Sequence, residues 1–311
     1  MKKFITLEPA SIATALALFA FVSCINSIQD DSETVDNEKV TVNISLSGFN
    51  LSFEEDEVTT RASDQNAAQA EVTRIALSVF DGSEQLVYSS KKKSSVNTED
   101  FDSFSCELLP GSYTFVAVAH KANADSDEAA TITSPTVATI TTDKVYKTFA
   151  KTQAVTIVEG QTNNVTIDFG KRITSTFQIA TTDDTPTNVA SCEIIINPSL
   201  STTTAYTINP STGLATDIYQ QKVTILKSNT GNTFKDKALS IYCFLKENPQ
   251  NIAVTVNMKD ASDNVVKTRT FDNVPMALHR VTRAKGNFFP SSASGSFTFD
   301  NSDDDTHLIS F

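Results

Sequence analysis

The strongest constraint on the fold is a period-two alternation of apolar and polar side chains that begins near residue 40. Within Val40–Leu46 every second residue is Val, Ile or Leu, and the residues between them are Thr, Asn or Ser. Such alternation is typical of a β-strand with one buried face. The alternation changes parity at Gly48, which predicts a bulge or a break between two strands. No segment behind the first 24 residues shows sustained helical periodicity, so the sequence predicts an all-β fold.

Short strands are expected in two series, separated near Gly170–Ile173. Turn signals such as Asp81-Gly82 and Pro110-Gly111 punctuate the first series, and regularly spaced short strands of this kind favour β-sandwiches. The segment Tyr113–Ala119 is apolar on both faces and is predicted to be a central strand. The expected core positions are Ile75, Leu77, Val79, Phe115 and Ala117 in the first series, and Ile194, Ile196, Ile241, Leu245, Val254 and Val256 in the second.

The N-terminus has the pattern of an export signal. Lys2 and Lys3 precede an apolar stretch at about residues 12–22, which is too short for a confident membrane-spanning helix. The stretch ends in Phe21-Val22-Ser23-Cys24, which resembles a lipobox, the site where signal peptidase II cuts before a lipidated cysteine. Phe21 departs from the more usual Leu. The alternative is an ordinary secretory signal with an incidental cysteine at position 24.

Composition and motifs argue against several functions. The formal net charge of −12 disfavours nucleic acid as a partner, because phosphate binding needs clustered Lys and Arg. The chain lacks the motifs of phosphate loops, zinc proteases and serine hydrolases, and its three histidines are far apart, so we expect no enzyme, no cofactor and no metal site. Cys106, Cys192 and Cys243 lie in alternating patterns and are expected to be buried free thiols. The alternative is a Cys192–Cys243 disulfide in an oxidising compartment.

Two segments behind the lipobox carry a family resemblance. Val72–Asp81 is followed by Leu86-Val87, and Leu108–Ala119 contains the turn signal Pro110-Gly111 ahead of the apolar run Tyr113–Ala119. In this order they resemble the Bacteroidales fimbrillin-like lipoproteins, the subunits and anchor proteins of type V pili. The resemblance implies two tandem transthyretin-like β-sandwich domains and a pilus subunit or anchor that assembles by strand exchange and serves adhesion.

The resulting organisation has five parts. They are a signal peptide at 1–23, a flexible acidic tether at 24–39, sandwiches at 40–171 and 172–289, and a tail at 290–311. Lipid, including palmitate, is expected on Cys24, which would hold the protein at the outer membrane on the cell surface. The expected partners are other pilus subunits, the membrane through that lipid, and host or bacterial surface ligands.

The resemblance also implies proteolysis at an arginine near the N-terminus and a donor strand elsewhere in the chain. Arg61 is the candidate because it lies between an acidic run and a polar, Ala-rich stretch, whereas Arg74 starts an alternating strand. A cut after Arg61 would free Val40–Phe53, whose apolar face is expected to fill a groove. The donor candidates alternate with polar residues in the tail, and they are Phe297, Phe299, Ile309 and Phe311.

Two alternatives stay open. The tail residues could instead form a terminal hairpin on their own sheet. The protein could be a surface glycan-binding lipoprotein, although the absence of Trp weakens this interpretation, because stacking on exposed aromatic rings is how such proteins hold sugars.

Overall fold

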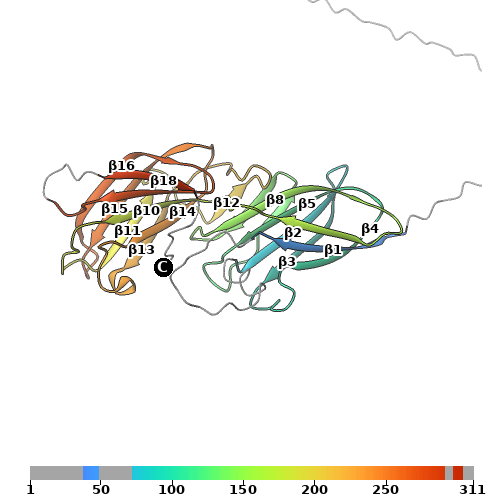
Figure 1. Ribbon diagram of the computed structural model, residues 1–311, viewed down its shortest axis with the longest axis horizontal. Helices are drawn as coiled ribbons and strands as arrows, with labels where there is room; N and C mark the ends of the chain where they lie inside the picture. Colours follow the sequence, from blue (N-terminus) through green and yellow to red (C-terminus); the bar gives the residue numbers. More distant parts are fainter. Residues whose placement is uncertain (1–37, 49–71, 291–296, 304–311) are drawn as a thin grey trace, which may run out of the picture. The chain divides into compact units, whose positions relative to one another are not determined.

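The computed structural model describes residues 38–48, 72–290 and 297–303 as an all-β protein (Figure 1). Its strands pair into five sheets, and the only helix among the described residues is a short 3-10 turn, η1, at Lys227–Thr230. No helix in this part of the chain has the length and apolar character needed to cross a bilayer. The prediction of an all-β, sandwich-type fold is confirmed.

The first sandwich packs a three-stranded sheet against a four-stranded sheet. The three-stranded sheet has the order β4 (Ser103–Leu108), β1 (Val40–Ser47), β9 (Asn163–Asp168). The four-stranded sheet has the order β3 (Leu86–Lys93), β2 (Arg74–Asp81), β5 (Gly111–His120), β8 (Thr148–Ile157). The core between them contains all five positions predicted for the first series, and β5 is central, as its apolar faces predicted. Burial of these side chains against each other holds the two sheets together.

The second sandwich packs two four-stranded sheets. One has the order β14 (Ala238–Cys243), β10 (Ser175–Thr181), β17 (Arg280–Gly286), β18 (Thr298–Asp303). The other has the order β13 (Gln221–Leu226), β11 (Ser191–Ile196), β15 (Gln250–Lys259), β16 (Val265–Met276). Their shared core contains the six positions predicted for the second series.

A fifth sheet joins strands from both series, which the sequence did not predict. It has the order β12 (Ala205–Ile208), β7 (Val137–Thr141), β6 (Thr131–Ser134), and β12 pairs antiparallel with β7 over four residues. A third apolar cluster lies beside it and combines Phe80 and Val116 with Tyr206 and Phe244. Residues 37–311 therefore form one compact unit, and the division at Gly170–Ile173 into two domains stays a prediction.

The three described cysteines are buried free thiols, as expected. The alternative Cys192–Cys243 disulfide is absent from the described residues, although both side chains belong to the same core. Burial raises the pKa of Cys243 to about 12 and that of Cys192 further, so neither thiol forms the reactive thiolate readily.

Candidate strand-exchange site

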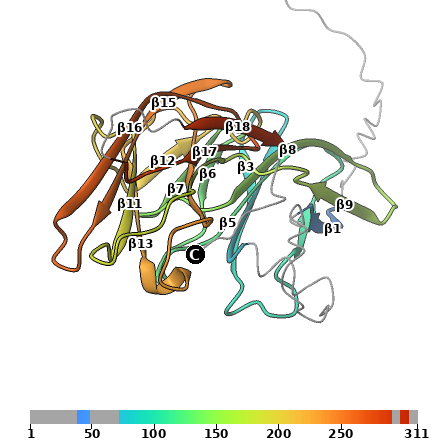
Figure 2. The ribbon, with the colours of Figure 1, turned by 60° about the vertical axis from the view of Figure 1, so that its left-hand side comes forward.

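Strand β1 occupies the centre of its sheet, although it is the first strand of the described chain. It pairs antiparallel with β4, from Val40 opposite Leu108 to Ser45 opposite Ser103, and parallel with β9 on its other side (Figure 2). A central strand of this kind fills a slot that two other strands leave open. Its removal would leave unpaired backbone N–H and C=O groups on both β4 and β9.

The inward side chains of β1 complete the first core. Val42, Ile44 and Leu46 are at most 3% exposed, and they pack against side chains of the facing four-stranded sheet. The apolar face of β1 therefore fills a groove, and residues 49–53 of the segment Val40–Phe53 lie outside the described chain. The groove is apolar on its floor, and both of its sides offer backbone hydrogen bonds, so it fits a strand with apolar residues at alternate positions.

The outward face of β1 is held only by weak polar contacts. Asn43 donates from Nδ2 to Oδ1 of Asn164 at 3.2 Å, and the hydroxyls of Ser45 and Thr166 lie 3.2 Å apart. These side chains are exposed, so such bonds contribute little net stability. The affinity of β1 for its slot therefore comes from its backbone pairing and its three buried side chains.

Gly48 ends β1 at the parity change noted in the sequence. Its φ is +81°, and a Cβ there would lie 2.1 Å from Oδ1 of Asp168. Only glycine fits both the conformation and the space. The backbone amide of Phe169, the residue directly after β9, donates to the carbonyl of Ser47 at 3.1 Å. This bond keeps the end of β1 in register with β9.

Cys106 lies on β4, beside β1 in the same sheet, where it reports on the slot. It is opposite Val42 in the ladder between β1 and β4 and is 7% exposed. Burial raises the pKa of the Cys106 thiol to about 11, and the charge of the adjacent Glu107 adds to the shift. The thiol is therefore unreactive while β1 is in place.

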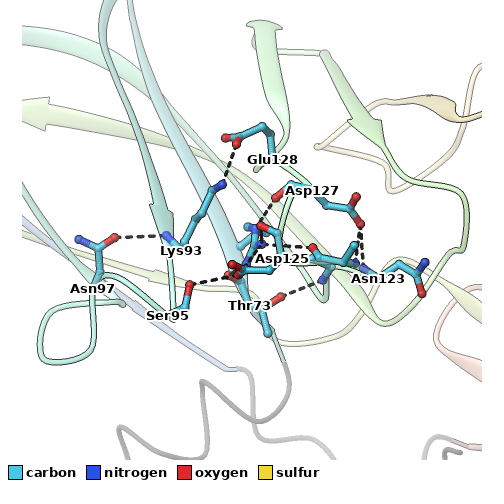
Figure 3. Close-up of polar contacts among 11 residues, drawn as sticks. Thr73, Lys93, Ser95, Asn97, Asn123, Asp125, Asp127 and Glu128 are labelled. Carbon is cyan, nitrogen blue, oxygen red and sulfur yellow. Dashed lines mark hydrogen bonds and ion pairs between the residues drawn. The ribbon is translucent and has the colours of Figure 1, made fainter.

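Arg74, the alternative arginine for cleavage, is 2% exposed at the start of β2. Its guanidinium donates to the carbonyl oxygens of Thr73 and of Ala124, Asp125 and Asp127 in the loop after β5, at 2.6–3.3 Å. Three of these acceptor residues, Thr73, Asp125 and Asp127, lie close together in Figure 3. A protease cannot reach a side chain held in this way. Arg74 is therefore poorly placed for cleavage, and a cut after Arg61 stays a prediction.

The predicted site residues are only partly within the described chain. Cys24, Arg61, Ile309 and Phe311 lie outside it. β18, which begins next to Phe297, pairs antiparallel with β17 of the same chain. The rings of Phe297 and Phe299 contact Phe271 of β16 with centroid distances of 5.0 and 5.7 Å, so this part of the tail packs on its own sandwich.

The described residues contain no group of three or more His, Cys, Asp or Glu side chains placed to hold a metal ion. One hollow, with a volume of about 640 Å³, lies beside β1, β3 and β4. It is open to solvent, and its lining includes Tyr88, Lys92 and Asp100. Lys92 and Asp100 form an ion pair there, with Nζ 2.6 Å from Oδ2.

Comparison with known proteins gives a family match and a set of similar structures. The model of the family of fimbrillin-A associated anchor proteins Mfa1 and Mfa2 matches residues 38–289. The fimbrial anchor protein Mfa2 from Porphyromonas gingivalis is 11% identical with a TM-score of 0.43, over 84% of this chain and 95% of that chain. The tip fimbrial protein Mfa3 from the same organism, with a C-terminal truncation, is 9% identical with a TM-score of 0.44, over 85% and 99%. A fimbrial assembly protein from Parabacteroides distasonis is 12% identical with a TM-score of 0.43, over 85% and 96%. No curated protein sequence matches the chain.

Proposed function

The chain belongs to the family of fimbrillin-A associated anchor proteins Mfa1 and Mfa2, and we propose from this that it is a structural component or anchor of a cell-surface pilus. The observation that carries the proposal is the extent of the match, which runs from residue 38 to residue 289 and so covers both sandwiches. Its partners in this role are other pilus subunits, and the function of the assembled pilus is adhesion.

Strand exchange is the proposed mode of assembly. The support is the central position of β1, whose apolar side chains fill a slot between β4 and β9 that another alternating strand could fill equally well. A cut after Arg61 would free β1 from covalent attachment to β2. The donor in the next subunit would be a segment like the tail strand, with Phe297 and Phe299 at alternate positions.

Attachment to the outer membrane through lipid on Cys24 is the second part of the proposal. Its support is the lipobox pattern and the polar, acidic segment that follows it, which suits a tether. Signal peptidase II would remove residues 1–23. More than one acyl chain is needed for stable retention, because a single chain binds a bilayer only marginally.

Immunogold electron microscopy of cells that express the protein tests the proposed role. Gold label on surface filaments, or at their bases, is expected, and gold on a bare cell surface would contradict it. Deletion of the gene separates the two forms of the role. Loss of an anchor should release intact filaments into the medium, whereas loss of a stalk subunit should leave no filaments in either fraction.

The glycan-binding alternative receives no support from the exposed surface. Phe299 is 43% exposed, and it is the only aromatic residue among the described residues that is neither buried nor half-buried. A sugar-binding surface built by stacking needs several such rings together. The pilus role therefore remains the favoured one.

A further inference from the structure

The two sandwiches repeat one strand order, and the repeat differs at a single position. The sheet β3-β2-β5-β8 corresponds to β13-β11-β15-β16, and the sheet β4-β1-β9 corresponds to β14-β10-β17. In each sandwich the first strand, β1 or β10, runs parallel to the last, β9 or β17. Only the second sandwich continues beyond this point, because β18 covers the outer edge of β17. Among the described residues nothing pairs with the equivalent edge of β9.

The outer edge of β9 has a regular row of backbone groups that no other described strand pairs with. The amide of Phe169 bonds to the carbonyl of Ser47, so by alternation Asn164, Thr166 and Asp168 direct their N–H and C=O groups away from β1. β9 pairs with β1 over six residues without a register shift, and its sequence contains neither Lys nor Pro. Register shifts, Lys and Pro are the features that usually protect an edge strand from further pairing, and β9 has none of them.

The edges of β3 and β4 differ from that of β9. β3 ends in Lys91-Lys92-Lys93, which disfavours the approach of another strand. β4 has no lysine, but its counterpart β14 is also an edge of its sheet, so the repeat gives no reason to expect a strand beside β4. The edge of β9 is the one whose counterpart is covered.

The second sandwich shows what kind of strand covers such an edge. β18 runs antiparallel to β17. Phe297 packs against the core, and the rings of Phe297 and of the more exposed Phe299 both contact Phe271 on β16 of the facing sheet. In the first sandwich β8 occupies the place of β16, and its Val155 is only partly buried against the core. An incoming strand with apolar residues at alternate positions would cover that side chain.

We propose that the outer edge of β9 is a docking site for an extended segment of a neighbouring pilus subunit, added antiparallel to β9 with apolar residues at alternate positions. The added strand would complete the first sandwich as β18 completes the second. β1 remains in its slot in this mode, so neither a cut after Arg61 nor the loss of β1 is needed. The identity of the occupant rests on the proposed pilus role, whereas the availability of the edge rests on the repeat alone.

Hydrogen–deuterium exchange on the complete mature chain, made soluble by Cys24→Ala, tests the proposal. The probe is a synthetic peptide of residues 294–305, and the control peptide has Ser in place of Phe297 and Phe299. In the free chain the amides of Asn164, Thr166 and Asp168 should exchange rapidly. With excess probe their exchange should slow at least tenfold, whereas the control peptide should leave it unchanged. The amides of β1 should be unaffected by either peptide.

A proline variant checks that backbone pairing causes the protection. Thr166→Pro removes one N–H that has no partner in the sheet, and an edge strand tolerates this change. It should abolish probe binding while the melting temperature stays close to that of the parent. The matched control is Ser105→Pro, which removes an outward N–H from the edge of β4 and should leave probe binding intact.

Four outcomes would overturn the proposal. They are protection of these β9 amides in the free chain, which would mean that the chain's own residues cover the edge; protection at β17; release of β1 on adding the probe; and no protection at all. Should Thr166→Pro fail to fold, the exchange data on the parent protein still decide the matter. A negative result with the peptide would not change the interpretation of the immunogold experiment. Likewise, the absence of gold from filaments would not change the interpretation of the peptide experiment.

Discussion

Release of β1 should make Cys106 reactive, and this provides a direct assay of strand exchange. The perturbation is a cut at a sequence-specific protease site placed at Arg61, in a soluble Cys24→Ala chain. Cys106 is opposite Val42 of β1, so it is shielded as long as β1 stays in its slot. The cut alone should not expose it. Burial of Val42, Ile44 and Leu46 contributes about 1.5–3 kcal/mol for each side chain, which holds the strand without a covalent link.

A second change should weaken that retention. Ile44→Ala removes buried methyl groups at the middle of β1 and is expected to cost about 2–5 kcal/mol, which lowers the affinity of the cut strand by about 30-fold or more. In the uncut chain the same substitution lowers stability but leaves β1 attached and at high local concentration. Cys106 should therefore become reactive only when the cut and Ile44→Ala are combined, or when excess donor peptide is added to the cut chain.

The size of the change follows from the chemistry of the thiol. In the folded chain the pKa of Cys106 is about 11, so at pH 8 about one thiol in a thousand is ionised. On exposure the pKa returns to about 8.5, and about a quarter is ionised. The exposed thiolate has the lower pKa and is therefore roughly tenfold less nucleophilic than the buried thiolate. The larger ionised fraction outweighs this loss, so the labelling rate should rise about 20-fold before any gain in access.

Maleimide labelling followed by peptide mass spectrometry measures this rate, and Cys192 and Cys243 are internal controls. Both are buried in the core of the second sandwich and should remain unlabelled. Equal labelling of all three cysteines would indicate global unfolding. If Cys106 reacts no faster than the controls in the cut Ile44→Ala chain, β1 does not leave its slot and the proposed exchange is wrong.

Four further predictions concern the two ends of the chain and one buried histidine. Cys24→Ala should abolish palmitate labelling and move the protein out of the membrane fraction, and a labelled, membrane-bound variant would contradict lipidation. N-terminal sequencing of protein from filaments should find Ala62 if Arg61 is processed, whereas a start at Cys24 would favour the anchor role. Deletion of Ser296–Phe311 removes β18 and the packing of Phe297, so the melting temperature should fall by about 3–10 °C while unfolding stays cooperative; an unchanged melting temperature would show that the tail adds nothing to its own sandwich. Burial, aided by the charge of Arg74, lowers the pKa of His120 to about 4, so the unfolded chain takes up the proton first and stability should fall by about 3 kcal/mol from pH 6.5 to pH 4; urea titrations should show this slope reduced in His120→Gln, and an identical slope would refute it.

Local patterns predicted the strands far better than their pairing. The alternation in Val40–Leu46 identified β1 and its buried face, and the apolar faces of Tyr113–Ala119 identified a central strand. The place of β1 between β4 and β9 could not be predicted, because its partner on one side lies more than 100 residues away in the sequence. Period two specifies a face and says nothing about which strand is a neighbour.

The features that the sequence did not predict depend on the same long-range pairing. β12 lies in the second series of strands along the sequence, yet its partner is β7, which lies in the first. Arg74 was recognised as the start of a strand, but its burial beneath the loop after β5 depends on four backbone carbonyls that leave no trace in residue type. Backbone acceptors are available at every residue, so composition does not indicate which of them converge on a guanidinium.

The proposed lipid on Cys24 and the proposed cut after Arg61 constrain each other. A cut after Arg61 would separate the lipidated segment, which includes β1, from the rest of the chain. Within the described residues, the pairing of β1 with the first sandwich would then link the two parts. That link is noncovalent, so pulling on the filament would draw β1 along its own axis and would have to break its pairing with β4 and β9 together. A stalk subunit benefits from such a separation, because loss of β1 frees both the subunit and its groove. An anchor under load does not, and for it the outer edge of β9 offers a way to join the filament with β1 still in place.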